Sequence, residues 1–200
     1  MNLYLVRHGQ TNGNVKGKYL GSYEDELSLQ GINEINETKK LITDVCFDKV
    51  FCSERKRAFD SAKILTDSEI VCTGSLNERD FGIFENKTYK EICRDYPSEK
   101  IEWENNWIDY KIPKGESVKE VYDRIEGFMK MLETVDYENC LAVTHGGVIR
   151  LIYCYILGGN LNNFWKFTSG NGNISIVKLQ YNNWHIDSIV QLNSIGIMKP

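Results

Sequence analysis

The sequence lacks the features that mark several classes of protein. It has no C-x-x-C pair, no grouping of cysteine and histidine with zinc spacing, and only 3 histidines in 200 residues. The longest apolar run, 151–157, is too short to cross a bilayer, and residues 1–7 have no basic lead of the kind that opens a signal peptide. We therefore expect no metal, no other cofactor and no membrane partner.

Neither sign of charge dominates the chain. Lysine plus arginine number 24 and aspartate plus glutamate number 28, for a net charge of −4. Such a balance gives no general attraction for nucleic acid or anionic lipid, so nucleic acid is not an expected partner. Any bound anion must be held by a local cluster of positive groups. The apolar content of 42% and the length of 200 residues suit one globular domain.

The 6 cysteines show no pairing pattern. Five of them lie in or beside apolar runs: Cys46, Cys52, Cys72, Cys140 and Cys154. We interpret them as small buried apolar side chains of a reduced, cytoplasmic protein.

Short apolar runs alternate with helical patterns along most of the chain. Strands are expected at 2–7, 49–53, 70–73, 140–144, 174–179 and 184–192, and helices at 28–42, 55–66, 89–95, 99–107, 117–132 and 148–157. This alternation predicts an α/β fold with a mostly parallel central sheet. Ligands of such folds bind beyond the carboxyl ends of the strands.

Charged and polar side chains gather where these strands are expected to end. The first strand ends in Arg7-His8-Gly9, and another ends in Thr144-His145-Gly146-Gly147. A helix begins near Arg57, and the loop-rich middle of the chain carries Glu78. Guanidinium groups and helix N-termini both suit phosphate oxygens. The pattern predicts a phosphate site built without a metal.

The same segments resemble the histidine phosphatase superfamily, also called the phosphoglycerate mutase-like family. Five motifs in the order of that family carry the resemblance: Leu5–Asn14, Ser53–Ala58, Glu78–Glu85, Pro113–Ser117 and Thr144–Gly147. The resemblance implies a three-layer α/β/α sandwich in which residues 1–200 form a single domain. It also implies an aromatic-rich cap at about 76–114.

The resemblance further implies a metal-independent hydrolase that acts through a phosphohistidine. His8 would be the nucleophile, and Glu78 would act as general acid and then as general base. Arg7, Arg57 and His145 would neutralise the phosphoryl oxygens. The positions expected to bind phosphate or substrate are Asn14, Thr11, Arg79, Gly146, Trp103 and Trp107. Arg55 and Lys56 are interpreted as solvated helix charges, Glu85 as a structural residue and His185 as a plain sheet residue.

The identity of the small-molecule phosphate ester stays open, as does the oligomeric state. Looser stretches, including 47–53, 76–82 and 164–167, resemble the α-ribazole phosphatases of cobalamin biosynthesis, which favours α-ribazole 5′-phosphate. The alternatives are a broad-specificity small-molecule phosphatase and a phosphoglycerate mutase, the latter disfavoured because the chain has no Arg-Arg pair. A phosphate-binding or protein-binding module without catalysis is a further alternative function, of a different class. The shared helix face of Trp103 and Trp107 either packs on the body of the protein or lines the pocket mouth.

Overall fold

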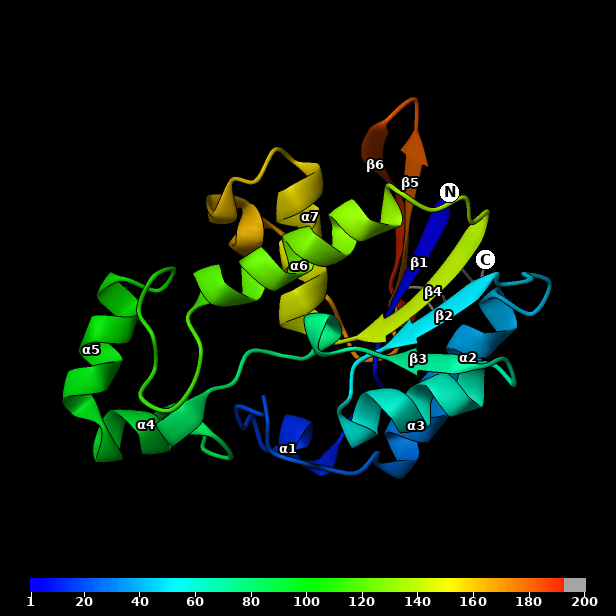
Figure 1. Cartoon of the computed structure of the whole chain (residues 1–200). Coiled ribbons are helices and arrows are strands. Elements are labelled where there is room, and N and C mark those ends of the chain that lie inside the picture. The colour runs from blue at the N-terminus through cyan, green and yellow to red at the C-terminus, as the bar shows by residue number, and fades with distance from the viewer. Residues whose placement is uncertain (193–200) are drawn as a thin grey trace, which may run out of the picture.

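A six-stranded mixed sheet forms the centre of the molecule, with the strand order β3-β2-β4-β1-β5-β6 (Figure 1). The structure is a computed structural model and describes residues 1–192, so the last eight residues of the expected domain lie outside it. Neighbours among the first four strands in this order are parallel, and β5 and β6 are antiparallel additions at one edge. The strands span Asn2–Arg7 (β1), Lys49–Cys52 (β2), Ile70–Cys72 (β3), Asn139–Thr144 (β4), Ile174–Gln180 (β5) and Asn183–Val190 (β6). The predicted α/β class is confirmed.

The register of β1 and β4 determines which residues lie side by side where these two strands end. Arg7 at the end of β1 pairs with Thr144 at the end of β4. The next residues are His8 and His145, and the backbone N–H of His8 donates to the carbonyl of Thr144 at 2.9 Å. Parallel pairing therefore brings the two histidines to the same point of the sheet edge.

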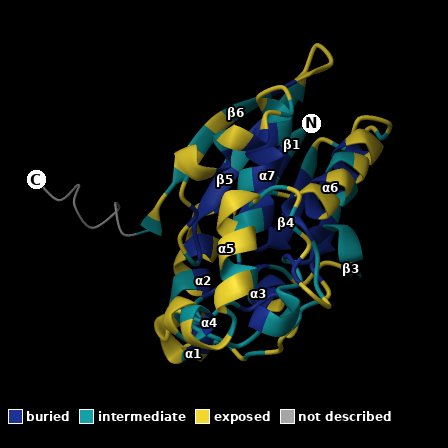
Figure 2. Cartoon of the chain, turned by 90° about the vertical axis from the view of Figure 1, so that its left-hand side faces the viewer, coloured by how far each residue is buried: buried dark blue, intermediate teal, exposed yellow. Residues whose placement is uncertain are grey.

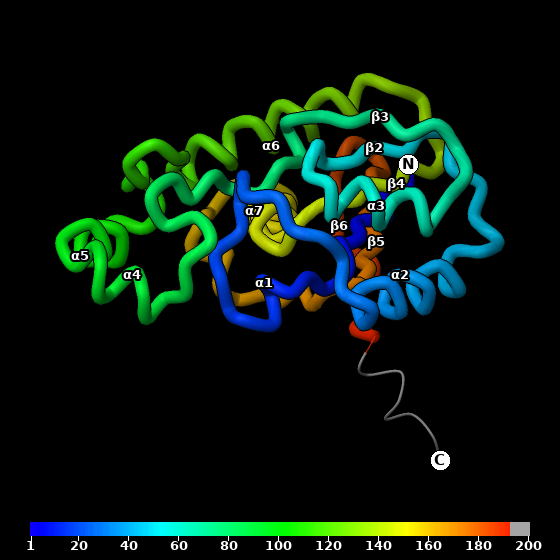
Figure 3. Tube along the Cα trace, turned by 90° about the horizontal axis from the view of Figure 1, so that it is seen from below, coloured from blue at the N-terminus to red at the C-terminus, as the bar shows by residue number. Residues whose placement is uncertain are grey.

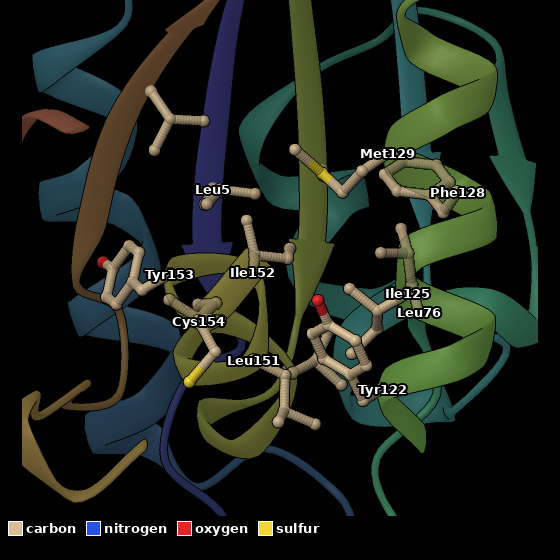
Figure 4. Packing of buried hydrophobic residues seen from close by; sticks show 14 of the residues in the cluster. Leu5, Leu76, Tyr122, Ile125, Phe128, Met129, Leu151, Ile152, Tyr153 and Cys154 are labelled. Atoms are coloured by element: carbon tan, nitrogen blue, oxygen red, sulfur yellow. The ribbon is translucent and has the colours of Figure 1, made fainter. Parts of the chain in front are cut away.

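Helices cover both faces of the sheet, as the three-layer prediction requires. α2 (Leu29–Leu41) and α3 (Lys56–Leu65) lie on one face, and α6 (Val118–Leu132) and α7 (Gly146–Ile156) lie on the other (Figure 1). Successive side chains of a strand point to opposite faces of the sheet and so contribute to both cores. Leu5 packs toward α6 and α7, while Val6 packs toward α2 and α3. In Figure 4, Met129 of α6 lies over β4, with Ile152 of α7 beside it.

The predicted helix start at Ser117 is confirmed in its details. The Ser117 hydroxyl accepts from the backbone N–H of Glu120 at 3.1 Å, and the Glu120 carboxylate accepts from the backbone N–H of Ser117 at 2.8 Å. This reciprocal cap fixes where α6 begins. Helix α6 is amphipathic along its whole length, because its apolar side chains recur every three or four residues.

A smaller unit, the cap, stands away from the sheet (Figures 1 and 3). It contains α4 (Tyr89–Asp95) and α5 (Pro97–Asn105), and a separate apolar cluster of Phe84, Ile92 and Ile112 holds it together. None of the residues of α5 is buried, and this helix is largely yellow and teal in Figure 2. The remaining elements are α1 (Asn12–Val15) and the 3₁₀ helices at Gly74–Leu76, Gly82–Phe84 and Leu161–Lys166.

The expected helix at 99–107 is wrong at both ends. Pro97 occupies the first turn of α5, where its missing N–H costs nothing, and the helix ends at Asn105. Trp107 therefore lies beyond the helix and does not share a helical face with Trp103. Trp103 packs against Phe84 in the cap, whereas Trp107 packs against Phe164 beside α7.

Two of the cysteines also contradict the prediction. Cys52, Cys140 and Cys154 are buried, and burial raises the pKa of the Cys140 and Cys154 thiols to about 11. Cys46 and Cys72 are exposed, because one follows the end of α2 in a loop and the other ends the edge strand β3. All six thiols are free. Within residues 1–192, no helix is both long and apolar enough to span a membrane.

Candidate active site

His8 is buried at the carboxyl end of β1, with 3% of its surface exposed. Its Nδ1 lies 2.8 Å from the carbonyl oxygen of Gly9, which can only accept, so Nδ1 carries the proton. Burial, followed by the positive charges of Arg57 and Arg7, holds the pKa of His8 well below its usual range. The ring is therefore neutral, and its unprotonated Nε2 is available as a nucleophile.

His145 meets His8 edge to face, with 5.0 Å between ring centroids. Its Nε2 lies 2.8 Å from the Ser53 hydroxyl, which donates its own proton to Asn77 Oδ1 at 2.8 Å. Ser53 must then accept from His145, so the proton of the neutral ring is on Nε2. Nδ1 is buried without a partner among the described residues. Burial, and after it Arg57, holds the pKa of His145 well below its usual range.

Two arginines lie beside this pair, and backbone carbonyls are the acceptors described for both. Arg57, 1% exposed, donates to the carbonyls of Leu20, Gly21 and Tyr23 at 2.9 to 3.0 Å. Arg7 donates to the carbonyl of Ser169. The Nε atoms of both are buried without a partner in the described part of the chain. Carbonyls orient these cations but do not neutralise them, which leaves positive charge for an anion.

Glu85 holds the loop that holds Arg57. Its carboxylate accepts from the backbone N–H groups of Gly21, Ser22, Tyr23 and Phe81 at 2.8 to 3.1 Å. Gly21 is required here, because a Cβ would lie 1.9 Å from the carbonyl oxygen of Arg79. The interpretation of Glu85 as a structural residue is confirmed.

Glu78 lies at the N-terminus of α7, on the edge of the cluster. Its carboxylate accepts from the backbone N–H of Gly147 at 3.2 Å and from that of Arg79 at 3.0 Å. A Cβ at position 147 would lie 2.5 Å from Glu78 Oε1, so any other residue there would displace the carboxylate from this position. The negative charge of Glu78 raises the pKa of Arg7 and Arg57 against the effect of burial.

The polar residues expected around the phosphate lie beside His8. Thr11 is buried and caps α1 by accepting from the backbone N–H of Asn14. Asn14 Oδ1 accepts from the backbone N–H of Thr11 and from Asn171, which also donates to the carbonyl of His8. Thr11 thus acts on the site by holding Asn14. Gly146 lies against the Arg7 guanidinium, which would be 3.4 Å from a Cβ there.

A cavity of about 520 Å³ adjoins the cluster at Glu78 and Gly147. Aromatic side chains make up much of its wall: Tyr19, Phe81, Tyr89, Trp103, Trp107, Phe164 and Trp165. Both tryptophans of the sequence prediction therefore line the cavity and also pack, each in a different aromatic cluster. Arg79 lines it too, but its guanidinium donates to the carbonyls of Glu116 and Tyr110, which fastens the cap.

Three contributors were missed by sequence reasoning. Arg150 of α7 lines the cavity, and its position four residues after Gly146 places it on the same helix face, a signal that could have found it. Arg55, expected to be solvated, has a buried Nε without a partner among the described residues and lowers the pKa of His145. Asn171 gave no local signal. Among residues 1–192, no three histidine, cysteine, aspartate or glutamate side chains lie close enough to hold a metal ion.

The chain is similar to several known phosphatases over most of its length. The adenosylcobalamin/alpha-ribazole phosphatase of Escherichia coli K12 is 32% identical over 177 residues, covering 86% of this chain and 87% of that protein. Phosphoserine phosphatase 1 of Hydrogenobacter thermophilus is 25% identical, covering 89% and 86%. The crystal structure of the alpha-ribazole phosphatase from Shigella flexneri superimposes with a TM-score of 0.89 at 30% identity, covering 96% of each chain.

The family assignment rests on most of the chain. The profile of the histidine phosphatase superfamily (branch 1) matches residues 3–191, from the first strand to the end of the last. The chain therefore belongs to branch 1 of the histidine phosphatase superfamily.

Proposed function

We propose that this protein is a metal-independent phosphomonoester hydrolase that transfers the phosphoryl group to Nε2 of His8 and then to water. One observation carries the proposal: a buried, neutral imidazole with an unprotonated Nε2 lies beside two guanidinium groups whose Nε atoms have no partner in the described chain. A phosphate dianion supplies the acceptors and the negative charge that this arrangement lacks.

The first step breaks the ester bond. The Nε2 lone pair of His8 attacks phosphorus while the P–O bond to the alcohol breaks in line with it. Glu78 acts as the general acid and gives a proton to the leaving oxygen. Arg7 and Arg57 stabilise the charge that spreads over the remaining phosphoryl oxygens.

The second step regenerates the enzyme. Water replaces the alcohol and attacks phosphorus, the N–P bond breaks, and Glu78 takes the proton of the water. His145 contacts a phosphoryl oxygen through Nδ1, which has no partner among the described residues, and donates a hydrogen bond there when Nδ1 carries a proton. Asn14 and the backbone N–H of Gly146 complete the phosphate contacts.

The favoured substrate is α-ribazole 5′-phosphate. The relative of this name in Escherichia coli and the similar Shigella flexneri structure support it, as does an aromatic cavity able to stack a planar base. A broad-specificity small-molecule phosphatase is the alternative, because stacking alone selects weakly among rings. A phosphoglycerate mutase is less favoured, since Arg79 is engaged by backbone carbonyls.

Organisation and location are part of the same proposal. Residues 1–200 act as one domain, with 76–114 as the cap that closes over the leaving group. The six free thiols suit a reduced compartment such as the cytoplasm.

Replacing His8 by alanine should abolish turnover, because the wild-type enzyme forms a bond to Nε2. Rapid acid-free quenching with ³²P-labelled substrate should trap acid-labile phosphate on the wild-type protein and none on H8A. H185A, on strand β6, is the matched control and should behave as wild type. Trapped label on H8A, or loss of wild-type activity in EDTA, would contradict the metal-free phosphohistidine route.

Replacing Glu78 by glutamine should slow esters of basic alcohols far more than p-nitrophenyl phosphate. General acid catalysis contributes about 10²- to 10⁴-fold, and a nitrophenolate leaves without it. E102Q, an exposed change on α5, is the control. Equal losses on alkyl and aryl esters would show that Glu78 has another role.

The protonation of His8 predicts a pH effect on stability. The folded pKa of His8 is lowered, so below about pH 6.5 the unfolded chain binds a proton that the folded chain does not, and stability falls as pH falls. Between pH 6.5 and 5.5 the loss from this one group is about 1 kcal/mol. Urea unfolding of wild type and H8Q should show H8Q gaining that amount relative to wild type over this interval. A constant difference would mean that folded His8 becomes protonated.

The substrate assignment can be tested at Trp107. Stacking on a base contributes about 1–3 kcal/mol, so W107L should raise KM for α-ribazole 5′-phosphate about tenfold or more and spare p-nitrophenyl phosphate. Wild type should also hydrolyse α-ribazole 5′-phosphate more efficiently than 3-phosphoglycerate. Net interconversion of 3- and 2-phosphoglycerate with little phosphate release would favour the mutase instead.

A further inference from the structure

Arg150 is a cation that faces the cavity from α7. It lies one helical turn beyond Gly146 and Gly147, where the helix borders Glu78. Its guanidinium carbon lies 5.3 Å from the ring centroid of Phe164 and 5.6 Å from that of Trp165. Aromatic faces hold a guanidinium in place without using its N–H donors, which point outward in its plane.

The donor capacity of Arg150 is incompletely used within the described chain. Its Nε is buried and has no hydrogen-bond partner among residues 1–192. Burial lowers its pKa, and the charge of Glu78 acts in the opposite direction. No acceptor among residues 1–192 is paired with this guanidinium, which lines the cavity, so its outer N–H groups can bind a ligand oxygen there.

Arg150 differs in this respect from the other arginine of the cavity wall. Arg79 donates from Nε to the carbonyl of Glu116 at 2.8 Å and from Nη2 to the carbonyl of Tyr110 at 3.0 Å. Arg7 and Arg57 lie on the histidine side and are not part of the cavity lining. Arg150 is therefore the lining arginine with a buried donor left for the leaving group.

The wall of the cavity brings together groups suited to different parts of a phosphate ester. Glu78 borders the phosphate cluster, and Arg150 of α7 lines the same cavity. The rings of Trp107 and Phe164 line it too and lie 5.6 Å apart between centroids. A ribose between a 5′-phosphate and a base carries oxygens that a guanidinium in this cavity can bind.

We propose that Arg150 is a specificity-determining residue, whose guanidinium donates a hydrogen bond to a sugar oxygen of the leaving group. The enzyme then selects phosphate esters of ribose-like alcohols over esters of plain alcohols. This inference rests on the proposed phosphatase function and adds the part of the substrate that lies between phosphate and base.

The test compares R150M and R150K with wild type on five esters. Ribose 5-phosphate and α-ribazole 5′-phosphate carry sugar oxygens, n-pentyl phosphate and p-nitrophenyl phosphate do not offer them, and O-phospho-L-serine carries a carboxylate. R94M, on the exposed face of α4, is the matched control. R150M should lose about 10- to 100-fold in kcat/KM on the two ribose esters and stay within about threefold on the pentyl and nitrophenyl esters.

Two further measurements separate binding from folding. The inhibition constant of inorganic phosphate should be unchanged in R150M, because phosphate does not reach the sugar subsite. R150K keeps the charge but not the planar fork, and should recover only part of the loss. If R150M does not fold, judged by its circular dichroism, the same comparison with R150K and R150Q decides.

Each other outcome overturns the inference in a recognisable way. Equal loss on all five esters would assign Arg150 to positioning Glu78, and no loss on any would remove it from recognition. A larger loss on phosphoserine than on ribose 5-phosphate would replace the sugar oxygen by a carboxylate. Failure of wild type to hydrolyse any of the five would overturn the proposed function itself, and this inference with it.

Discussion

Buried positive charge held by backbone carbonyls is the constraint on which the arrangement of this molecule depends. Placing a cation in a protein interior costs several kcal/mol unless it is compensated. Arg57 is compensated in part by three carbonyls of the 20–23 loop, and that loop is itself fixed by the carboxylate of Glu85. The Glu85 carboxylate thus stabilises Arg57 indirectly, through the peptide groups of this loop. The negative charge is spread and distant enough for the guanidinium to keep its attraction for an anion.

Under the proposed function, the sheet and the cap divide the recognition of an ester between them. Strand ends supply the phosphate side, because parallel register brings His8 and His145 together at one edge. The cap and α7 supply the side of the alcohol, with aromatic rings from two separate clusters. Glu78 lies between these two sides, and its carboxylate accepts a hydrogen bond from the first turn of α7. A change in the cap can therefore alter the leaving group without disturbing the phosphate cradle.

The parts that sequence reasoning predicted are those with local signals. Strand periodicity, the Ser117 cap and the glycines after each histidine were visible in a few residues, and they located both the sheet and its active edge. Arg57 was visible only through the spacing of a motif. What failed were properties set by distant contacts: the exposure of Cys46 and Cys72, the end of α5 before Trp107, and the burial of the Nε atom of Arg55. No window of the sequence shows that Asn171 returns to hold Asn14 and the carbonyl of His8.

The pairing of β1 with β4 has a consequence for how the protein matures. His8 and His145 lie far apart in the sequence and become neighbours only when β1 pairs with β4. Contacts of such long separation form slowly, since the closure of a large loop precedes any gain from them. The cost of desolvating Arg7 and Arg57 falls on the same event. A chain still emerging from the ribosome holds β1 and His8 without β4, so the two histidines come together only once β4 has been made and has joined β1.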